Sequence, residues 1–584
     1  MDEDQKRMAE ELLFSNQAKA SFAKRLFFGH FDNEQILPYP NLNDSEINKN
    51  NEFIAKLKDY AEKNINPDKI DREEKIPEEV ISGLGELGVL GMTVPKQYGG
   101  LDMSQNAYCQ AIEVIASRCG GTAVFTNAHQ SIGLKGILLF GTKEQKDKYL
   151  PSLATGKKVS AFSLTEPNAG SDAAGVETTA IYDEQKKVYR INGQKQWTTN
   201  GSIAQVLTVM AKTEVKTERG IEEKVTAFLV EPSMKGFKVT NPGLEKVGIR
   251  GTRTTNLEFT DLEVPKENIL GPLGGGLRVC LTCLDYGRTT FGAMCTGAAR
   301  YTVQRAIDHA MTRRQFNRPL SSFSLVKKKI AEMSALVYAM DASTYLTAGM
   351  IDAGEEDVML EAAILKVFAS DALWDILYDT MQIFGGRSFF TSEPFERMMR
   401  DARLNMIGEG SNEVLRAFIG LVGMRDVGMS LKAVSDASKK PIKNFSSLFK
   451  FFLNTIKQLR SPKIHIRSKH LQKEATQLSK EVRSFGLSII KQLAKHKEDI
   501  VEKQLVLNRI TNCVIALFTI SAVISKLDTA LNLNNDDPKK VGKDFSIGKL
   551  YCKMAFKKIR DNKNSLKENL DSDIESVAEI IAGK

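Results

Sequence analysis

The sequence of 584 residues is poor in the residue types that build disulfide frameworks and metal sites. It contains seven cysteines, six histidines and two tryptophans. The cysteines are scattered and odd in number, which predicts a reducing compartment without structural disulfides. Cys280 and Cys283 form a lone Cys-x-x-Cys, and without a second pair at metal spacing we expect reduced helix residues. The histidines form no cluster, so we expect no protein-bound metal ion.

Long hydrophobic runs are also absent. No run reaches the roughly 18 consecutive apolar residues that span a bilayer, and the most apolar stretch, Val514 to Ile524, predicts a buried helix. The acidic start, Met1-Asp-Glu-Asp4, resembles neither a secretory signal nor a transit peptide. We therefore expect a bacterial-type cytoplasm, or a chain whose presequence is already absent. The net charge of +9 fits anionic ligands or an acidic membrane surface, and no pattern typical of nucleic-acid binding is present.

Hydrophobic periodicity predicts a mainly α-helical protein with a central β domain. Short β-rich runs lie between about 159 and 275, and the helical three-and-four period precedes and follows them. The expected parts are an N-terminal extension (1–48), a helical domain (49–158), a middle β domain (159–276), a helical bundle (277–430), a basic segment (431–469) and an additional helical domain (470–584).

The expected strands contain Val188–Ile191, Val206–Val209, Val225–Val230, Phe237–Val239 and Leu257–Phe259. We expect turn residues at Asn192-Gly193, Asn200-Gly201 and Asn241-Pro242-Gly243. The glycines from Gly271 to Gly276 have the wrong spacing for a dinucleotide fingerprint, so they predict a turn between domains.

Three segments carry chemistry-bearing residues. Phe162-Ser-Leu-Thr-Glu-Pro-Asn-Ala-Gly-Ser-Asp172 combines hydroxyls with small residues and is able to cradle a polar ring or a phosphate. Gln194-Lys-Gln-Trp-Thr-Thr-Asn-Gly201 holds one of the two tryptophans. Arg403-Leu-Asn-Met-Ile-Gly-Glu-Gly-Ser-Asn-Glu413 places a carboxylate between two glycines and a helix cap after it. Each segment alone is equally compatible with an ordinary loop or core.

Together, and in this order, the three segments resemble the acyl-CoA dehydrogenase family. Thr312-Arg-Arg-Gln-Phe316 and Met381-Gln-Ile-Phe-Gly-Gly386 resemble two further family motifs, so the resemblance extends from about 49 to 428. The additional helical domain, the leader around Ser21–Pro40 and the stretch Ala128–Ile137 resemble the very-long-chain branch, and a mitochondrial branch that assembles respiratory complex I is comparably close.

The resemblance implies a flavoprotein that converts a fatty acyl-CoA to the trans-2-enoyl-CoA. Glu409 would be the base that removes the α-proton, with its own N–H helping to stabilise the thioester oxygen. Some relatives place the base at the position of Gly287, which has no side chain to act. The residues implied for FAD are Phe162, Thr165, Ser171, Trp197, Thr198, Thr199, Arg313, Phe316, Gln382, Gly385, Gly386, Ser411, Asn412 and Arg509. Those implied for the substrate are Ser171, Arg288, Gly408 and Gly410.

Several positions depart from the family pattern. Gly408 stands where relatives usually have an aromatic residue, Ser411 replaces a threonine, and Ser324 stands where a glutamine often follows the phenylalanine. Asn127 stands near the position where the very-long-chain branch has a glycine at the tunnel floor, and a bulkier residue there would shorten the acyl tunnel.

The segment from Lys439 to Lys469 has nine lysines or arginines and no acid. Its apolar residues, from Phe445 to Leu459, recur at helical spacing. This pattern favours a helix on an anionic membrane surface over one docked on the additional domain.

The resemblance therefore implies a homodimer that passes electrons to an electron-transfer flavoprotein. Its location would be cytoplasmic or peripheral to the inner membrane in a bacterium, and the mitochondrial inner membrane or matrix in a eukaryote. An assembly or scaffold protein with secondary catalysis, and an acyl-CoA oxidase, remain as alternatives. The oxidase is disfavoured because the chain does not end in Ser-Lys-Leu.

Overall fold

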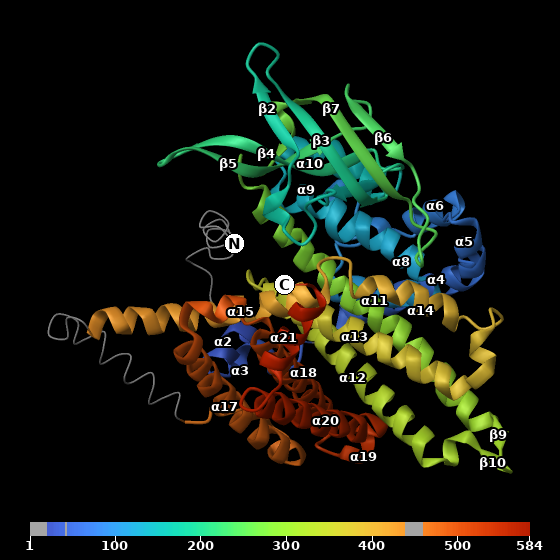
Figure 1. The fold of residues 1–584 in the computed structure, drawn as a ribbon. Helices are drawn as coiled ribbons and strands as arrows, with labels where there is room; N and C mark the ends of the chain where they lie inside the picture. The colour runs from blue at the N-terminus through green and yellow to red at the C-terminus, as the bar shows by residue number, and fades with distance from the viewer. Residues whose placement is uncertain (1–19, 41–43, 439–459, 584) are drawn as a thin grey trace. The chain divides into compact units, whose positions relative to one another are not determined.

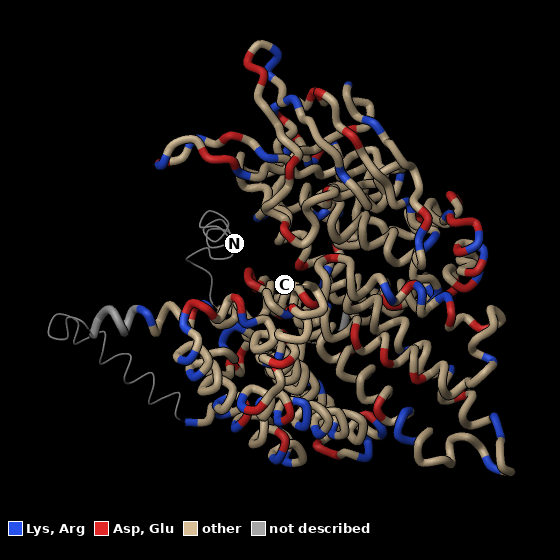
Figure 2. Tube along the Cα trace, viewed as in Figure 1, with Lys and Arg blue, Asp and Glu red and all other residues tan. Residues whose placement is uncertain are grey.

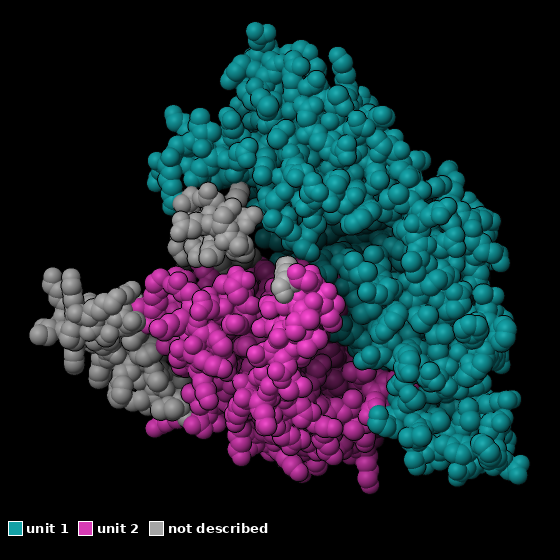
Figure 3. Space-filling model, viewed as in Figure 1, with its two compact units in different colours: residues 1–17, 42–330, 369–411 teal, residues 18–41, 331–368, 412–584 magenta. Residues whose placement is uncertain are grey.

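The computed structural model describes residues 20–40, 44–438 and 460–583. The chain divides into two compact units, coloured separately in Figure 3. Unit 1 holds 42–330 and 369–411, and unit 2 holds 18–41, 331–368 and 412–584. Acidic and basic residues are interspersed along both units (Figure 2).

Unit 1 begins with helices whose starts follow from local sequence. Ser104 and Thr142 cap α7 and α10, and Thr142 forms a capping box with Gln145. The helix that starts at Pro67 has its proline in the first turn, where a backbone N–H would have no partner within the helix. These elements are α4 (Asp44–Asn64), α5 (Pro67–Glu73), α6 (Glu78–Glu86), η1 (Val89–Gly91), η2 (Lys96–Tyr98), α7 (Gln105–Arg118), α8 (Gly120–Asn127), the π-helical η3 (Ala128–Gly133), α9 (Lys135–Phe140) and α10 (Lys143–Ala154).

A mixed eight-stranded sheet follows, with strand order β6-β7-β3-β2-β4-β5-β8 and with β1 parallel to β4 (Figure 1). Its elements are β1 (Ser160–Ser163), η4 (Ala173–Gly175), β2 (Thr179–Asp183), β3 (Val188–Thr199), β4 (Val206–Thr217), β5 (Gly220–Val230), β6 (Phe237–Asn241), β7 (Thr254–Pro265), η5 (Lys266–Asn268) and β8 (Ile269–Leu270). All five predicted strands are confirmed.

Both faces of the sheet are covered. Along β5, Val225, Ala227 and Leu229 join a core with residues of α9, α10 and the helix after the sheet. Phe228 and Val230 face the other core, with Leu257 of β7. Alternate side chains of one strand thus serve two cores, which explains why β4 and β5 read as continuous apolar runs.

One predicted turn is wrong. Asn192 and Gly193 lie inside β3, where the pairing with β7 shifts register between Ile191 and Gly193. A Cβ on Gly193 would lie 2.5 Å from the Thr178 hydroxyl, so the glycine serves a bulge in the strand rather than its reversal. The turn at Asn200-Gly201 and the one after Asn241, whose side chain accepts from the Gly243 N–H, are confirmed.

Long helices complete unit 1. The glycine-rich segment forms the predicted turn, with left-handed backbone at Gly271 and Gly274, and α11 begins at Gly276. Cys280 and Cys283 are buried residues of this helix, and burial raises the pKa of both thiols. The remaining elements are α11 (Gly276–Thr312), β9 (Arg314–Gln315), β10 (Arg318–Pro319), η6 (Leu320–Ser322), α12 (Ser324–Asp352), α13 (Met359–Phe384), η7 (Gly385–Phe389) and α14 (Phe395–Asn405). Helix α12 continues into unit 2, and α13 begins in unit 2 and continues into unit 1.

Unit 2 is helical, and the leader is part of it. Phe22 and Phe27 of the leader are buried and pack against Phe518 and Phe485, in a tilted and an edge-to-face arrangement. The elements are α2 (Phe22–Phe27), α3 (Asn33–Ile36), α15 (Asn412–Ser438), η8 (Lys469–Leu471), α17 (Gln472–His496), η9 (Lys497–Glu502), α18 (Gln504–Leu533), α19 (Pro538–Val541), α20 (Lys543–Ser565) and α21 (Asp571–Ile581).

Helix α18 contains the most apolar stretch of the sequence. Among the described residues it is the one helix long and apolar enough to cross a membrane, but 89% of its most apolar window is buried inside the protein. Every residue from Val514 to Ile524 is buried, as predicted for a core helix.

Candidate functional site

Glu409 lies in the turn that follows α14. Its backbone is left-handed, with φ of 57°, and Gly410 follows with φ of 96°. A left-handed glutamate costs roughly 1–3 kcal/mol, and such strain is typical of functional sites whose surroundings hold it in place. Helix α15 begins at Asn412, so Ser411 occupies the predicted N-cap position.

Two side chains hold this glutamate. The Asn127 amide Nδ2 donates to Glu409 Oε1 over 3.1 Å, and Arg288 Nε donates to the Glu409 carbonyl oxygen over 3.3 Å. Arg288 is itself buried and paired with Asp285 at 3.2 Å. Sequence reasoning singled out Glu409 and Arg288, and noticed Asn127 only as a departure near the tunnel floor.

Gly287 of α11 lies directly against the carboxylate. A Cβ at this position would be 2.6 Å from Glu409 Oε2. The position where some relatives carry the base is therefore beside the Glu409 carboxylate, and its lack of a side chain leaves room for that group.

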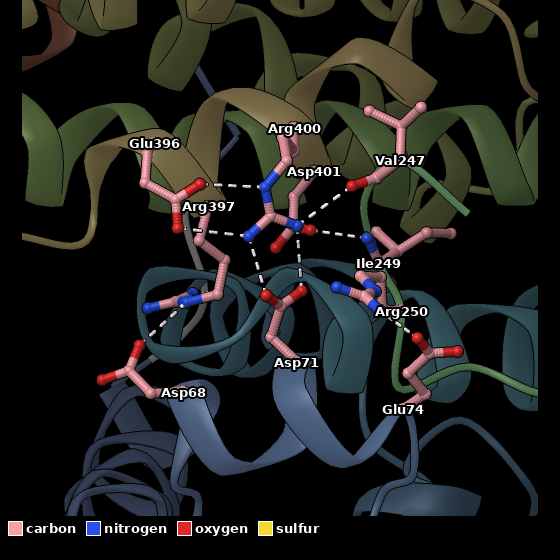
Figure 4. A network of polar contacts seen from close by, with 10 residues as sticks. All are labelled: Asp68, Asp71, Glu74, Val247, Ile249, Arg250, Glu396, Arg397, Arg400 and Asp401. Carbon is pink, nitrogen blue, oxygen red and sulfur yellow. Dashed lines mark hydrogen bonds and ion pairs between the residues drawn. The ribbon is translucent and has the colours of Figure 1, made fainter. Parts of the chain in front are cut away.

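Ion pairs fix α14, the helix that leads into the Glu409 turn (Figure 4). Arg400 forms a two-pronged pair with Asp71 of α5, at 2.7 and 3.1 Å, and Arg397 donates to Asp68 over 3.1 Å. Asp401 accepts from the Ile249 N–H, and burial raises the pKa of its carboxyl to about 6. These contacts fix α14, just before the Glu409 turn, to α5 and to the segment around Ile249.

The two hydroxyl-rich segments predicted for the cofactor lie side by side. The Gln196 N–H donates to the Thr165 carbonyl over 2.9 Å, and the Ser163 and Thr198 hydroxyls are 2.8 Å apart. Phe162, Thr165 and Thr199 are half-buried and Ser171 is exposed, so this surface is accessible to a ligand.

Trp197 stands out on this surface. The pairing of β3 with β7 shifts between Lys195 and Thr198, and within this bulge Trp197 takes a left-handed φ of 58°. Its indole is 61% exposed. A large exposed aromatic ring beside hydroxyls, in strained backbone, suits a planar ring ligand.

A buried ion pair lies behind the same surface, which sequence reasoning missed. Lys195 Nζ is 2.5 Å from Glu166 Oε1, and the two side chains are 0% and 2% exposed. Burial lowers the pKa of Lys195 to about 8, while Lys195 holds the pKa of Glu166 below its usual value despite burial. The alternation of β3 places the Lys195 side chain inside the protein. In the sequence, only its position in the same segment as Trp197 indicated that Lys195 lies near the predicted cofactor surface.

A second group of predicted cofactor residues is exposed at the ends of α11 and α13. A Cβ at Gly385 or Gly386 would meet open space, and Phe316 is 88% exposed. No contact among the described residues joins this group to the Glu409 turn. The exposed members are Arg313, Phe316, Gln382, Gly385 and Gly386.

The remaining predicted residues have their own surroundings. The buried Asn412 accepts from Lys366 Nζ over 2.9 Å, and Arg509 forms a two-pronged ion pair with Asp571 at the start of α21. A Cβ at Gly408 would make only ordinary contacts with Leu404, so the position has room for a side chain.

Four domain families match the chain. Residues 48–157, 161–262 and 274–423 match the N-terminal, middle and C-terminal domains of acyl-CoA dehydrogenases, and 469–584 match the ACAD9/ACADV C-terminal domain.

Among curated relatives, the mitochondrial very long-chain specific acyl-CoA dehydrogenase of Bos taurus is 35% identical over 569 residues, covering 95% of this chain and 85% of that protein. The human protein of the same name is 35% identical over 549 residues, covering 91% and 83%.

Among solved structures, an acyl-CoA dehydrogenase from Bacillus anthracis complexed with FAD is 27% identical with a TM-score of 0.79, covering 96% of this chain and 95% of that one. Butyryl-CoA dehydrogenase from Megasphaera elsdenii is 33% identical with a TM-score of 0.62, covering 66% and 99%. This chain belongs to the acyl-CoA dehydrogenase family.

Proposed function

We propose that the protein catalyses FAD-dependent α,β-dehydrogenation of long- or very-long-chain fatty acyl-CoA, the first step of fatty acid β-oxidation. The single observation that carries the proposal is Glu409, held in left-handed backbone by Asn127 and Arg288 with its carboxylate against Gly287. A carboxylate fixed in this way is suited to proton abstraction at one defined position.

The surface around Trp197 fits the isoalloxazine ring of FAD. Trp197 would pack against the ring, Phe162, Thr165, Thr198 and Thr199 would line it, and Ser171 would lie on the phosphate or substrate side. When bound, FAD supplies the acceptor for the hydride that leaves the substrate's β-carbon. The buried pair of Lys195 with Glu166 supports the proposal because it fixes both segments from behind.

The chain's own residues perform the proton chemistry. Glu409 removes the α-proton, which is weakly acidic beside a thioester, and its backbone N–H donates to the thioester oxygen as charge develops. Gly408 and Gly410 allow close approach of the acyl chain. Arg288, buried at the Glu409 carbonyl, fixes the backbone from which that N–H points.

We infer that the cofactor site is completed by a second copy of the chain. Arg313, Phe316, Gln382, Gly385 and Gly386 would hold the adenine half of the partner's FAD, and their exposure supports this role. Ser411 and Asn412 would contact the chain's own cofactor, and Arg509 would lie near it. The mature protein would then be a homodimer.

The remaining assignments are proposals of the same kind. The domain boundaries are those predicted from the sequence, and the electrons pass to an electron-transfer flavoprotein.

The basic segment 439–469 would bind an anionic membrane surface; residues 439–459 lie outside the described part of the chain. The mitochondrial names of the curated relatives support a mitochondrial membrane or matrix location for a eukaryotic source.

Product analysis tests the proposed function. Purified protein, incubated with acyl-CoAs of increasing length and an artificial electron acceptor, should yield a product lighter by two hydrogen atoms with the trans-2 double bond. Rapid peroxide formation with oxygen as sole acceptor would instead identify an oxidase. A flavoprotein that yields no enoyl product with any chain length would contradict the proposal and favour a scaffold role.

A further inference from the structure

Asn127 is buried beside the carboxylate of the proposed base, Glu409. It is the last residue of α8, is 2% exposed, and directly precedes the π-helical segment η3. A π-helical segment widens the helix locally and is often found at functional sites. Here it changes the helical phase immediately after Asn127, on the helix that presents this amide to Glu409.

The two ends of the Asn127 amide have different partners. Nδ2 donates to Glu409 Oε1 over 3.1 Å, while Oδ1 accepts from the Thr290 hydroxyl. Because a carboxylate only accepts and the Thr290 hydroxyl is able to donate, this orientation satisfies both neighbours. The carboxylate, which has no proton to donate, sets which end of the amide faces it, and Thr290, whose Oγ1 also lies 3.0 Å from the Tyr286 and Gly287 carbonyls, holds the other end in place.

A buried polar chain continues behind Thr290. The Ser131 hydroxyl lies 2.9 Å from Thr290 Oγ1, and the Tyr108 hydroxyl lies 3.4 Å from Ser131 Oγ. Tyr108, Ser131 and Thr290 are all buried, and burial raises the pKa of Tyr108, which keeps its proton. Side chains from α7, η3, α11 and α8 thus form a series of contacts that ends with Asn127 on one oxygen of Glu409.

We propose that Asn127, oriented by Thr290, is a positioning residue for the base: it fixes the Glu409 carboxylate and favours its charged form. This inference rests on the proposed function. An N–H donated to one carboxylate oxygen stabilises the anion and restricts its rotation. The base is then charged and aimed before substrate arrives, which lowers the cost of reaching the reactive geometry.

Three charged or titratable side chains lie among the described contacts around Glu409. Arg288 of α11 contacts the Glu409 carbonyl, with Asp285 as its partner, and Tyr108 of α7 lies behind Asn127. Tyr108 stays protonated throughout the working pH range. Loss of the Asn127 donor should therefore appear in the acidic limb of the activity profile.

The test compares turnover of long-chain acyl-CoA by the holoenzyme and two pairs of variants. Asn127→Leu keeps the shape and removes the donor, and should lower kcat about tenfold, the order of one positioned hydrogen bond to a charged group, with a much smaller change in KM. The acidic limb of its kcat/KM profile should move to higher pH. Thr290→Val should show the same changes in kcat and pH profile, in weaker form. Thr290→Ser, which keeps the hydroxyl, should have the kcat and the pH profile of the wild type.

A matched control is Thr302→Val, which removes a buried hydroxyl from the same helix α11; this hydroxyl donates to the Ala298 carbonyl and contacts Met398 Sδ, away from the Asn127 contacts. It should leave kcat and the pH profile unchanged. Thermal unfolding of the Asn127→Leu, Glu409→Gln and double variants gives a readout independent of turnover. The two substitutions should shift the unfolding midpoint non-additively, because the residues are in contact.

The outcomes separate the two proposals. If the wild type forms enoyl-CoA but Asn127→Leu keeps its kcat within twofold and its pH profile, the positioning role is wrong and the proposed function stands. If the wild type forms no enoyl-CoA, both fall. If folded Asn127→Leu and Thr302→Val lose kcat to the same extent, removal of any buried polar group lowers kcat. That result also overturns the inference.

Discussion

At the residue scale, the candidate base depends on a glycine as much as on the glutamate. Gly287 leaves the space that the Glu409 carboxylate fills, and a methyl group there would be 2.6 Å from Oε2. Gly287→Ala should therefore displace the carboxylate and lower kcat by about tenfold or more, since small misplacements of a base are costly.

The same variant should stay folded and retain flavin, because the hydroxyl-rich segments around Trp197 lie on other elements of unit 1. Flavin content from the visible spectrum and kcat from enoyl-CoA formation check this. Unchanged kcat in Gly287→Ala would mean that the carboxylate works from another position.

The buried pair of Lys195 with Glu166 provides a second prediction. Lys195→Met leaves Glu166 charged and buried, and breaking such a pair costs roughly 3–5 kcal/mol. Denaturant unfolding should show this loss, and the purified variant should contain less flavin. Lys186→Met is the matched control, since Lys186, in the turn before β3, pairs with Glu263 of β7 at a partly exposed site, and such pairs contribute about 0–1 kcal/mol. Equal effects of the two substitutions would contradict this account.

The sequence singled out Glu409, Trp197 and the hydroxyls as candidates because they stand in continuous motifs. It did not find the contact of Asn127 with Glu409, whose residues are 282 positions apart. It also gave no sign of the left-handed backbone at Trp197, because a bulge depends on how β3 pairs with β7. Such features depend on tertiary structure.

At the element scale, the leader helix α2 docks on a buried carboxylate. The Ala23 N–H donates to Glu361 Oε1 over 2.7 Å, and Glu361 is fully buried. Burial, and then the charge of Asp357, raise the pKa of Glu361 to about 7; Lys24 neutralises Asp357 at 2.6 Å.

This raised pKa predicts a pH dependence. The folded state keeps a proton that the unfolded state releases near its ordinary value of 4.5, so the free energy of unfolding falls as pH rises from about 4.5 through about 7. Glu361→Gln should remove that fall, matching the wild type near pH 5 and exceeding its stability at pH 8 by up to about 3 kcal/mol. Thermal unfolding at both pH values checks it, and a constant difference between the two proteins would contradict it.

The strands were predictable because short apolar runs are separated by turn residues along the sequence. The helices were predictable because their capping residues and their hydrophobic period lie within the helix's own stretch of sequence. The docking of the leader was not, since Phe22 and Phe27 contact residues more than 400 positions away. The reversal predicted at Asn192-Gly193 failed because the same dipeptide also serves a bulge.

At the scale of the whole molecule, the exposed segments that follow α11 and α13 predict assembly. Phe316 and Phe389 are 88% and 82% exposed, which is unusual for large apolar side chains unless a partner covers them. Phe316→Asp should yield monomers, measured by light scattering after size-exclusion chromatography, and these should lose FAD on dilution. Leu533→Asp, an exposed apolar position in α18, is the control and should remain dimeric. A Phe316→Asp dimer with normal FAD content would contradict the shared cofactor site.

The central claim is that Glu409 removes the α-proton in a flavin-dependent dehydrogenation. Anaerobic titration of the wild type with palmitoyl-CoA, beside Glu409→Gln with matched FAD content, tests it most directly. The account predicts that the visible flavin absorbance of the wild type bleaches and that Glu409→Gln binds the same ligand without bleaching. Bleaching of Glu409→Gln at the wild-type rate, or none in the wild type with any acyl-CoA, would contradict it.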